Sequence, residues 1–138
     1  MSQTNELEIM ERIALDLESV EESLASSFNT GAEDFNALIR PLSAAGGKRL
    51  RAQLCLLIAN AGTSIERQRV KIAEAVEMLH LATLIHDDVL DQAEIRRGED
   101  TIHMHKGNKV AILSGDYLFA KAFKIVSEMT NMKYLQVF

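Results

Sequence analysis

The chain has 138 residues, of which 47% are hydrophobic, and its formal net charge is −5. The hydrophobic content excludes a disordered chain, and the acidic balance argues against nucleic-acid binding, which needs a basic surface. A single cysteine and an N-terminus without the basic and apolar regions of a signal peptide predict a cytoplasmic protein. No stretch approaches the roughly 18–20 apolar residues of a membrane span.

The first 47 residues predict two amphipathic helices. Apolar residues recur three and four positions apart in the first helix, at Met10, Ile13, Leu17, Val20 and Leu24. Thr30 and Glu33 have capping-box spacing and are expected to open a short second helix. Pro41, followed by the glycines at 46–47, is expected to end it.

A third helix and a long central helix are expected next. The third is predicted over 48–60, and Thr63 and Glu66, again with capping-box spacing, are expected to open the fourth. This helix is predicted to run to about Asp91. Its middle part, 73–85, is apolar on nearly every side, which indicates that other helices surround it.

The rest of the chain predicts a loop and a last helix. Residues 92–108 are polar and contain two glycines, which is typical of a loop. The last helix is expected to pack through Leu118, Ala122, Phe123 and Val126. No segment alternates with period two, so no strand is predicted and the fold class is all-α.

The long helix is predicted to end in a cluster of carboxylates. Asp87 and Asp91 are four residues apart and share one face, whereas Asp88 lies about 100° further round an ideal helix. Carboxylates at the negative end of a helix dipole repel each other, and a hard divalent cation such as Mg²⁺ would offset that cost. A solvated acidic helix end is the alternative interpretation of this string taken alone.

Two groups of cations favour the metal interpretation. The string GGKRLR occupies 46–51, at the predicted start of a helix, and Arg96, Arg97 and Gly98 follow shortly after Asp91. Glycines before a helix N-terminus, with cations beside them, suit a phosphate group. Structural salt bridges would account for any one of the charged clusters taken alone. Together, the two groups of cations and the carboxylate cluster predict a phosphate site next to a metal site.

Three strings resemble, in order and spacing, the motifs of the trans-isoprenyl diphosphate synthase family: GGKRLR, HLATLIHDDVLDQAEIRRG and LSGDYLFAKAF, within residues 35–126. The resemblance implies an isoprenoid-synthase-type helical bundle that condenses isopentenyl diphosphate with an allylic diphosphate. It implies that 1–138 is the N-terminal part of one such domain, without the C-terminal half and its second aspartate-rich motif. The chain alone is therefore expected to have little or no activity.

The resemblance also implies a role for each motif residue. Asp87, Asp88 and Asp91 match the catalytic aspartate-rich motif, whose Mg²⁺ ions hold the allylic diphosphate. Arg96 matches an arginine that contacts the same diphosphate. The residues that match those holding the diphosphate of isopentenyl diphosphate are Lys48, Arg51, His80 and Arg97. One departure is Ala52, where the family commonly has proline.

His80 has a second interpretation. A lone histidine on an apolar helix is most often a hydrogen-bonded core residue. Its place on the helix above Asp87, at a family ligand position, favours the ligand role.

Product length and assembly are also implied by the resemblance. The family places bulky aromatics four and five residues before the first aspartate when the product is short, and here these positions are Thr83 and Ala82. A deeper pocket and a medium or long polyprenyl product, of the hepta- or octaprenyl type, are expected. The family also implies a homodimer, or a heterodimer with a small subunit. A non-catalytic helical subunit or interaction module is the alternative function.

Other positions are predicted to have structural roles. Arg49 is expected to support its cationic neighbours, and Cys55, within an apolar run, to be a buried and unreactive thiol. His86 is expected to stand behind the aspartates without binding a ligand. Gly115 is expected to allow close helix packing beside a structural Asp116.

Overall fold

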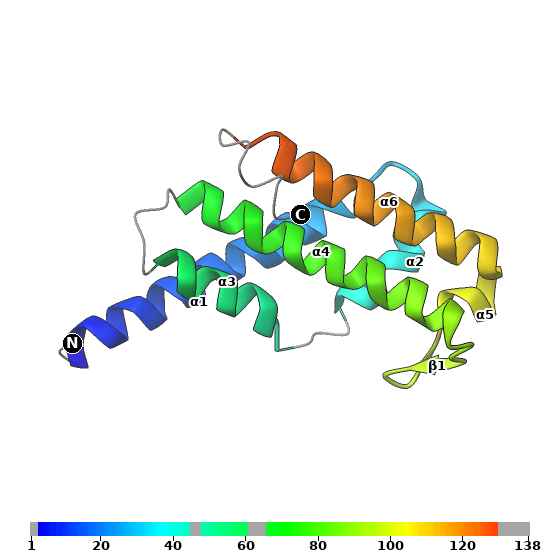
Figure 1. The fold of residues 1–138 in the computed structure, drawn as a ribbon, viewed down its shortest axis with the longest axis horizontal. Helices are drawn as coiled ribbons and strands as arrows, with labels where there is room; N and C mark the ends of the chain where they lie inside the picture. The colour runs from blue at the N-terminus through cyan, green and yellow to red at the C-terminus, as the bar shows by residue number, and fades with distance from the viewer. Residues whose placement is uncertain (1–2, 45–47, 61–65, 130–138) are drawn as a thin grey trace.

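A computed structural model describes residues 3–44, 48–60 and 66–129 (Figure 1). Within these ranges the helices are α1 (Gln3–Ser27), α2 (Glu33–Ala44), α3 (Leu50–Asn60), α4 (Glu66–Leu90), α5 (Ile102–Lys106) and α6 (Asn108–Ser127). Strands β1 (Ile95–Arg96) and β2 (Glu99–Asp100) form an antiparallel hairpin. The all-α fold class is confirmed, because this hairpin has only two residues in each strand.

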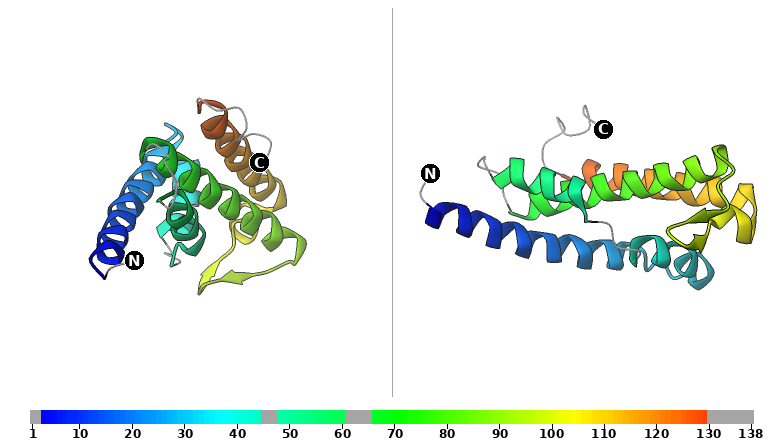
Figure 2. Two further views of the ribbon diagram at one scale, coloured as in Figure 1. Left: turned by 60° about the vertical axis from the view of Figure 1, so that its left-hand side comes forward. Right: turned by 90° about the horizontal axis from the view of Figure 1, so that it is seen from below.

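Helix α4 lies at the centre of the described structure. It packs against α6, α3 and α1, and α6 runs beside it over most of its length (Figure 1). The view from below in Figure 2 shows the long α1 passing along one side of this pair. The same view places α2, the hairpin and α5 at one end of the bundle, next to the carboxyl end of α4.

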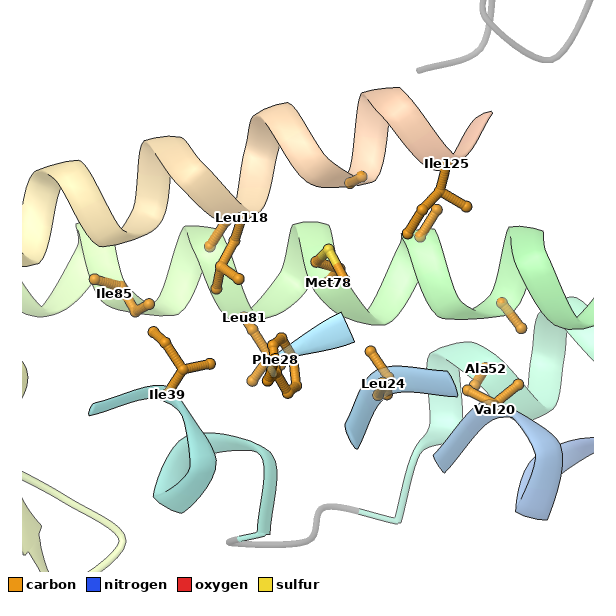
Figure 3. Close-up of a cluster of buried hydrophobic side chains, with 14 of the residues drawn as sticks. Val20, Leu24, Phe28, Ile39, Ala52, Met78, Leu81, Ile85, Leu118 and Ile125 are labelled. Atoms are coloured by element: carbon orange, nitrogen blue, oxygen red, sulfur yellow. The ribbon is translucent and has the colours of Figure 1, made fainter. Parts of the chain in front are cut away.

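The hydrophobic core follows the predicted helix periodicity. Figure 3 shows side chains from α1, α2, α3, α4 and α6 meeting in one cluster, among them Val20, Leu24, Phe28, Ile39, Ala52, Met78, Leu81, Ile85, Leu118 and Ile125. Each large aliphatic side chain buried in this way contributes about 1.5–3 kcal/mol. The prediction is wrong for two residues that were expected in the core: Met10 is 63% exposed and Phe123 is 41% exposed.

Buried polar groups between α1 and α4 are hydrogen-bonded. Glu74 is fully buried, and its carboxylate accepts hydrogen bonds from Ser23 and Ser27, each at 2.7 Å. Lys71 pairs with the same carboxylate at 2.7 Å. Because a buried carboxylate is costly without such partners, this cluster aligns α1 with α4. Elsewhere, Cys55 is half-buried, and burial raises the pKa of its thiol, as expected for an unreactive cysteine.

The start of α2 is close to the predicted position, but its contacts differ. The Thr30 hydroxyl donates to Asn36 Oδ1 at 2.9 Å and accepts from the backbone N–H of Ala32, so it does not cap through Glu33. Glu33 instead pairs with Arg40. The similar capping box expected at 63–66 lies partly outside the described residues.

Helix α2 does not end at Pro41 but continues to Ala44, with the proline inside it. The prediction that Pro41 ends the helix was therefore wrong. A proline removes one hydrogen bond, and neighbouring contacts can keep the helix intact around it. This continuation brings Pro41 and Leu42 to the pocket described below.

The region expected to be a loop, 92–108, contains the hairpin and α5. Arg97 and Gly98, with φ of 54° and 86°, are the two central residues of the hairpin turn. Positive φ at both positions is what a tight two-residue hairpin turn requires, and glycine adopts it without strain. Strands of two residues are too short to produce a detectable alternation. None of the described helices is long and apolar enough to cross a membrane.

Candidate diphosphate-binding site

A pocket of about 390 Å³ opens at the end of the bundle that carries the hairpin. Its walls come from α2, residues 48–51 at the start of α3, the carboxyl half of α4, the hairpin and α5. Apolar side chains such as Leu81, Leu84 and Ile102 form part of the lining, beside several charged groups. Segments far apart in the sequence therefore share one cavity with both apolar and cationic surface.

The structure brings the predicted cations together around this pocket. Lys48 and Arg51 reach it from the start of α3, and Arg96 and Arg97 reach it from the hairpin. His80 lines it from α4, with its Nε2 atom 3.2 Å from Nη1 of Arg51. All five side chains that the resemblance assigned to diphosphate binding therefore border one space.

The electrostatic surroundings of His80 favour its neutral form. Burial lowers the pKa of His80 below its ordinary value of 6.5, and the adjacent Arg51 lowers it further. Glu77, one turn earlier on α4, opposes this shift. The positive potential that disfavours an imidazolium is the same potential that attracts an anion.

The three aspartates at the end of α4 have different environments. Asp88 is 5% exposed, and its two carboxylate oxygens accept hydrogen bonds from Nε of Arg96 at 2.8 and 2.9 Å. This contact raises the pKa of the Arg96 guanidinium. Asp87 and Asp91 are both exposed, in agreement with the rotation expected from helix geometry. Asp88 therefore holds the hairpin, while the other two carboxylates face outward.

The exposed carboxylates of Asp87 and Asp91 suit Mg²⁺ better than a site built entirely from protein ligands would. Within the described ranges, no three histidine, cysteine or acidic side chains are close enough together to hold a metal ion. Mg²⁺ commonly takes one or two carboxylates and completes its shell with water and substrate phosphates. Asp87 and Asp91 fit that requirement, and Asp88 is already paired with Arg96.

The two expected chain-length positions differ in burial. Ala82 is fully buried in the apolar cluster, so a larger side chain there would overpack the core. Thr83 is exposed, and its hydroxyl donates to the carbonyl of His80 at 2.8 Å. Neither residue lines the pocket of about 390 Å³. Of the two, only Thr83 can be enlarged without disturbing the core.

Gly115 is a point of close contact between α4 and α6, as predicted. A Cβ atom at this position would lie 2.2 Å from Nε2 of His86. The His86 ring occupies that space and lies 3.1 Å from the carbonyl oxygen of Ile112 and 3.4 Å from the Asp116 carboxylate. His86 therefore joins the two helices one residue before Asp87.

The family of the chain follows from comparison with known proteins. A family profile described as Polyprenyl synthetase matches residues 32–138. The chain belongs to the polyprenyl synthetase family. The predicted resemblance to trans-prenyl synthases is thereby confirmed, and with it the helical-bundle fold.

Relatives within the polyprenyl synthetase family include named synthases. Octaprenyl diphosphate synthase from Escherichia coli (strain K12) is 33% identical over 129 residues, covering 94% of the chain. Heptaprenyl diphosphate synthase component 2 from Geobacillus stearothermophilus is 39% identical over 123 residues, covering 88% of the chain. The crystal structure of polyprenyl synthase from Caulobacter crescentus CB15, complexed with calcium and isoprenyl diphosphate, aligns with a TM-score of 0.85 and 36% identity over 92% of the chain.

The chain spans well under half of these polyprenyl synthetase relatives. It covers 40% of the octaprenyl synthase, 38% of the heptaprenyl component and 40% of the Caulobacter protein. The activity, substrates and partners of a whole synthase are therefore proposals for this chain.

Sequence reasoning missed the acidic residues Glu77, Glu99 and Asp100 in the lining of the pocket. Glu77 lines the pocket and contacts both Arg49 and the backbone of Ala52. For Glu77, the available signal was a glutamate in the apolar middle part of the helix, three residues before His80 and on the same face. The expected supporting role of Arg49 is consistent with its buried side chain, which pairs with Glu21 and Glu77.

Proposed function

We propose that this chain is the diphosphate-binding part of a synthase that condenses isopentenyl diphosphate with an allylic diphosphate to give a medium- or long-chain polyprenyl diphosphate. The observation that carries the proposal is the convergence of Lys48, Arg51, His80 and Arg97 on one pocket. Cations from two separate segments, the start of α3 and the hairpin, border one cavity with His80 of α4. They suit a doubly phosphorylated ligand, because each phosphate has several oxygens to neutralise.

The reaction proposed is a head-to-tail condensation. The C–O bond of the allylic diphosphate breaks, and diphosphate leaves with the electron pair. The double bond of isopentenyl diphosphate forms a new C–C bond to the resulting cation, and one proton is lost from the isopentenyl unit. The products are the longer allylic diphosphate, inorganic diphosphate and a proton, so atoms and charge balance.

The residues of this chain would act on the diphosphate groups. Lys48, Arg51 and Arg97 would hold isopentenyl diphosphate by charge and hydrogen bonding, with its double bond directed toward the allylic carbon. Asp87 and Asp91 would hold Mg²⁺, which when bound neutralises the leaving diphosphate. The apolar part of the lining would keep water from the allylic cation.

The proposal is tested by binding and turnover with the same preparation, after its intact mass has been verified. We expect the 138-residue chain to bind isopentenyl diphosphate, to bind farnesyl diphosphate far more tightly with Mg²⁺ than without it, and to form no product when both diphosphates are present. If the chain binds neither diphosphate, the proposed function is wrong and the alternative of an interaction module is favoured. A ladder of longer prenyl diphosphates in mass spectrometry would instead show that this chain alone is a working synthase.

His80 provides a pH-dependent prediction. Because the pKa of His80 is lowered in the folded chain, the unfolded chain binds more protons below pH 6.5, and stability is lost as pH falls below that value. A bound diphosphate reverses the local potential, so binding of isopentenyl diphosphate near pH 6 is expected to take up protons.

Calorimetric titrations in two buffers of different ionisation enthalpy measure that proton uptake. His80→Gln is expected to reduce the proton uptake to the part that comes from ionisation of the ligand phosphate, whose own pKa is about 6, and to flatten the loss of stability below pH 6.5. Equal proton uptake by the unaltered chain and by His80→Gln would contradict a role for His80 at the diphosphate.

Thr83 provides a test of product length. Thr83→Phe in the complete synthase proposed here is expected to shorten the main product by one or more isoprene units, because an aromatic ring on this exposed position of α4 would shorten the space for the growing chain. Chromatography of the dephosphorylated products measures the change. Thr83→Val, which keeps the size of the side chain, is the control. An unchanged product distribution in Thr83→Phe would place the pocket floor elsewhere.

A further inference from the structure

Glu77 is a charged residue in the pocket wall to which the proposed reaction assigns no role. It lies in the middle of α4, is 3% exposed, and is three residues from His80. A buried carboxylate is strongly unfavourable unless hydrogen bonds and opposite charges compensate it. Both of its oxygens have such partners, and both partners belong to the segment that carries Lys48 and Arg51.

One oxygen of Glu77 caps a helix to which the residue does not belong. Oε1 accepts the backbone N–H of Ala52 at 3.0 Å. Helix α3 begins at Leu50, so this N–H is one of the first four, which have no acceptor within their own helix. A negative charge at this end also interacts favourably with the helix dipole. A proline at position 52 could not make this bond, because it has no N–H.

The other oxygen of Glu77 pairs with Arg49, which lies in the sequence between Lys48 and Arg51, the two candidate diphosphate ligands. Nη1 of Arg49 lies 3.4 Å from Oε2 of Glu77, and the same guanidinium contacts Glu21 of α1 at 2.5 Å and 3.1 Å. Arg49 has a backbone φ of 46°, in the left-handed region that residues with a side chain rarely adopt. These ion pairs keep the Arg49 side chain buried within the bundle, and they tie the start of α3 to both α1 and α4.

We infer that Glu77 is a positioning residue for diphosphate binding: by capping α3 and holding Arg49, it fixes the start of α3 against α4. Lys48 and Arg51 then project into the pocket from a rigid segment, opposite His80. The inference rests on the proposed function, because it assigns to Glu77 the preorganisation of the proposed isopentenyl diphosphate ligands. A preorganised segment pays less conformational entropy when it binds.

The charge of Glu77 makes this inference distinguishable from a simple electrostatic effect. A carboxylate beside an anion-binding pocket repels the anion, so its neutralisation alone would strengthen binding of a diphosphate. A weaker cap and loss of the Arg49 ion pair would weaken binding, because a glutamine amide can still accept the Ala52 N–H but carries no charge. The two effects have opposite signs, and the sign of the change in affinity therefore separates them.

The test measures dissociation constants of isopentenyl diphosphate and of inorganic diphosphate by calorimetry, at a temperature where every variant is folded. Glu77→Gln is expected to weaken both about tenfold, or ~1.4 kcal/mol. It should also speed hydrogen exchange of the Ala52 amide, followed by NMR. Glu74→Gln is the matched control, because Glu74 is equally buried on the same helix but contacts Ser23, Ser27 and Lys71, none of which lines the pocket.

Each outcome has a definite meaning. Equal or tighter binding by Glu77→Gln, or the same weakening in Glu74→Gln, would overturn the inference while leaving the proposed function intact. An unaltered chain that binds neither diphosphate would overturn the proposed function and the inference with it. If Glu77→Gln does not fold, Glu77→Asp keeps the charge but shortens the reach to both partners. It is expected to weaken binding about threefold, and an unchanged dissociation constant there would also overturn the inference.

Discussion

Gly115→Ala is expected to lower the free energy of unfolding by about 2 kcal/mol, because the new methyl group would overlap the His86 ring. The overlap is severe, since the Cβ atom would lie 2.2 Å from Nε2 of His86. The ring cannot move without losing its contact with the carbonyl of Ile112. The expected sign is opposite to helix propensity, which by itself favours alanine over glycine by about 1 kcal/mol. Urea denaturation of the chain measures the change.

A double-mutant cycle identifies the cause of that loss. His86→Ala removes the ring and leaves space for a methyl group at position 115. In that background Gly115→Ala is expected to cost nothing or to be stabilising, which gives a coupling energy of at least ~2 kcal/mol between the two positions. If Gly115→Ala destabilises both backgrounds equally, then the close contact between α4 and α6 at His86 is not what requires glycine.

The second large effect is expected at the exposed carboxylates of α4. Asp87→Asn combined with Asp91→Asn is expected to reduce the gain in farnesyl diphosphate affinity on adding Mg²⁺ by about 100-fold, or ~2.7 kcal/mol. Both side chains are exposed at the carboxyl end of α4, on either side of Asp88, which lines the pocket, and their carboxylate oxygens are the type of donor that a hard cation prefers. Titrations with and without Mg²⁺ give the ratio of dissociation constants.

A charge-matched control accompanies this variant. Glu11→Gln combined with Asp34→Asn changes the net charge by the same amount at two exposed positions on α1 and α2. This control is expected to keep the full effect of Mg²⁺, because neither side chain belongs to α4 or the pocket. A full Mg²⁺ effect in the Asp87 and Asp91 variant would show that the metal is held by other groups.

For Asp88, helix geometry predicts the direction of the side chain but not its partner. An ideal helix turns about 100° for each residue, so Asp88 was expected to point in a different direction from Asp87. That much was predicted, but its partner was not. The partner, Arg96, belongs to a hairpin whose strands have two residues each, and the bidentate contact exists only because that hairpin folds back on α4.

The amino-acid sequence was sufficient to predict the order of the longer helices, the faces of the central helix and the three motifs that indicated a prenyl synthase. Those features depend on contacts within a few residues, where periodicity, glycines and charge spacing act directly. The tertiary structure was needed to show that Met10 is exposed, that Glu77 caps α3, and that cations at the start of α3 and in the hairpin border one pocket. These features depend on contacts between separate elements or on which neighbours cover a face, and a local pattern contains no information about either.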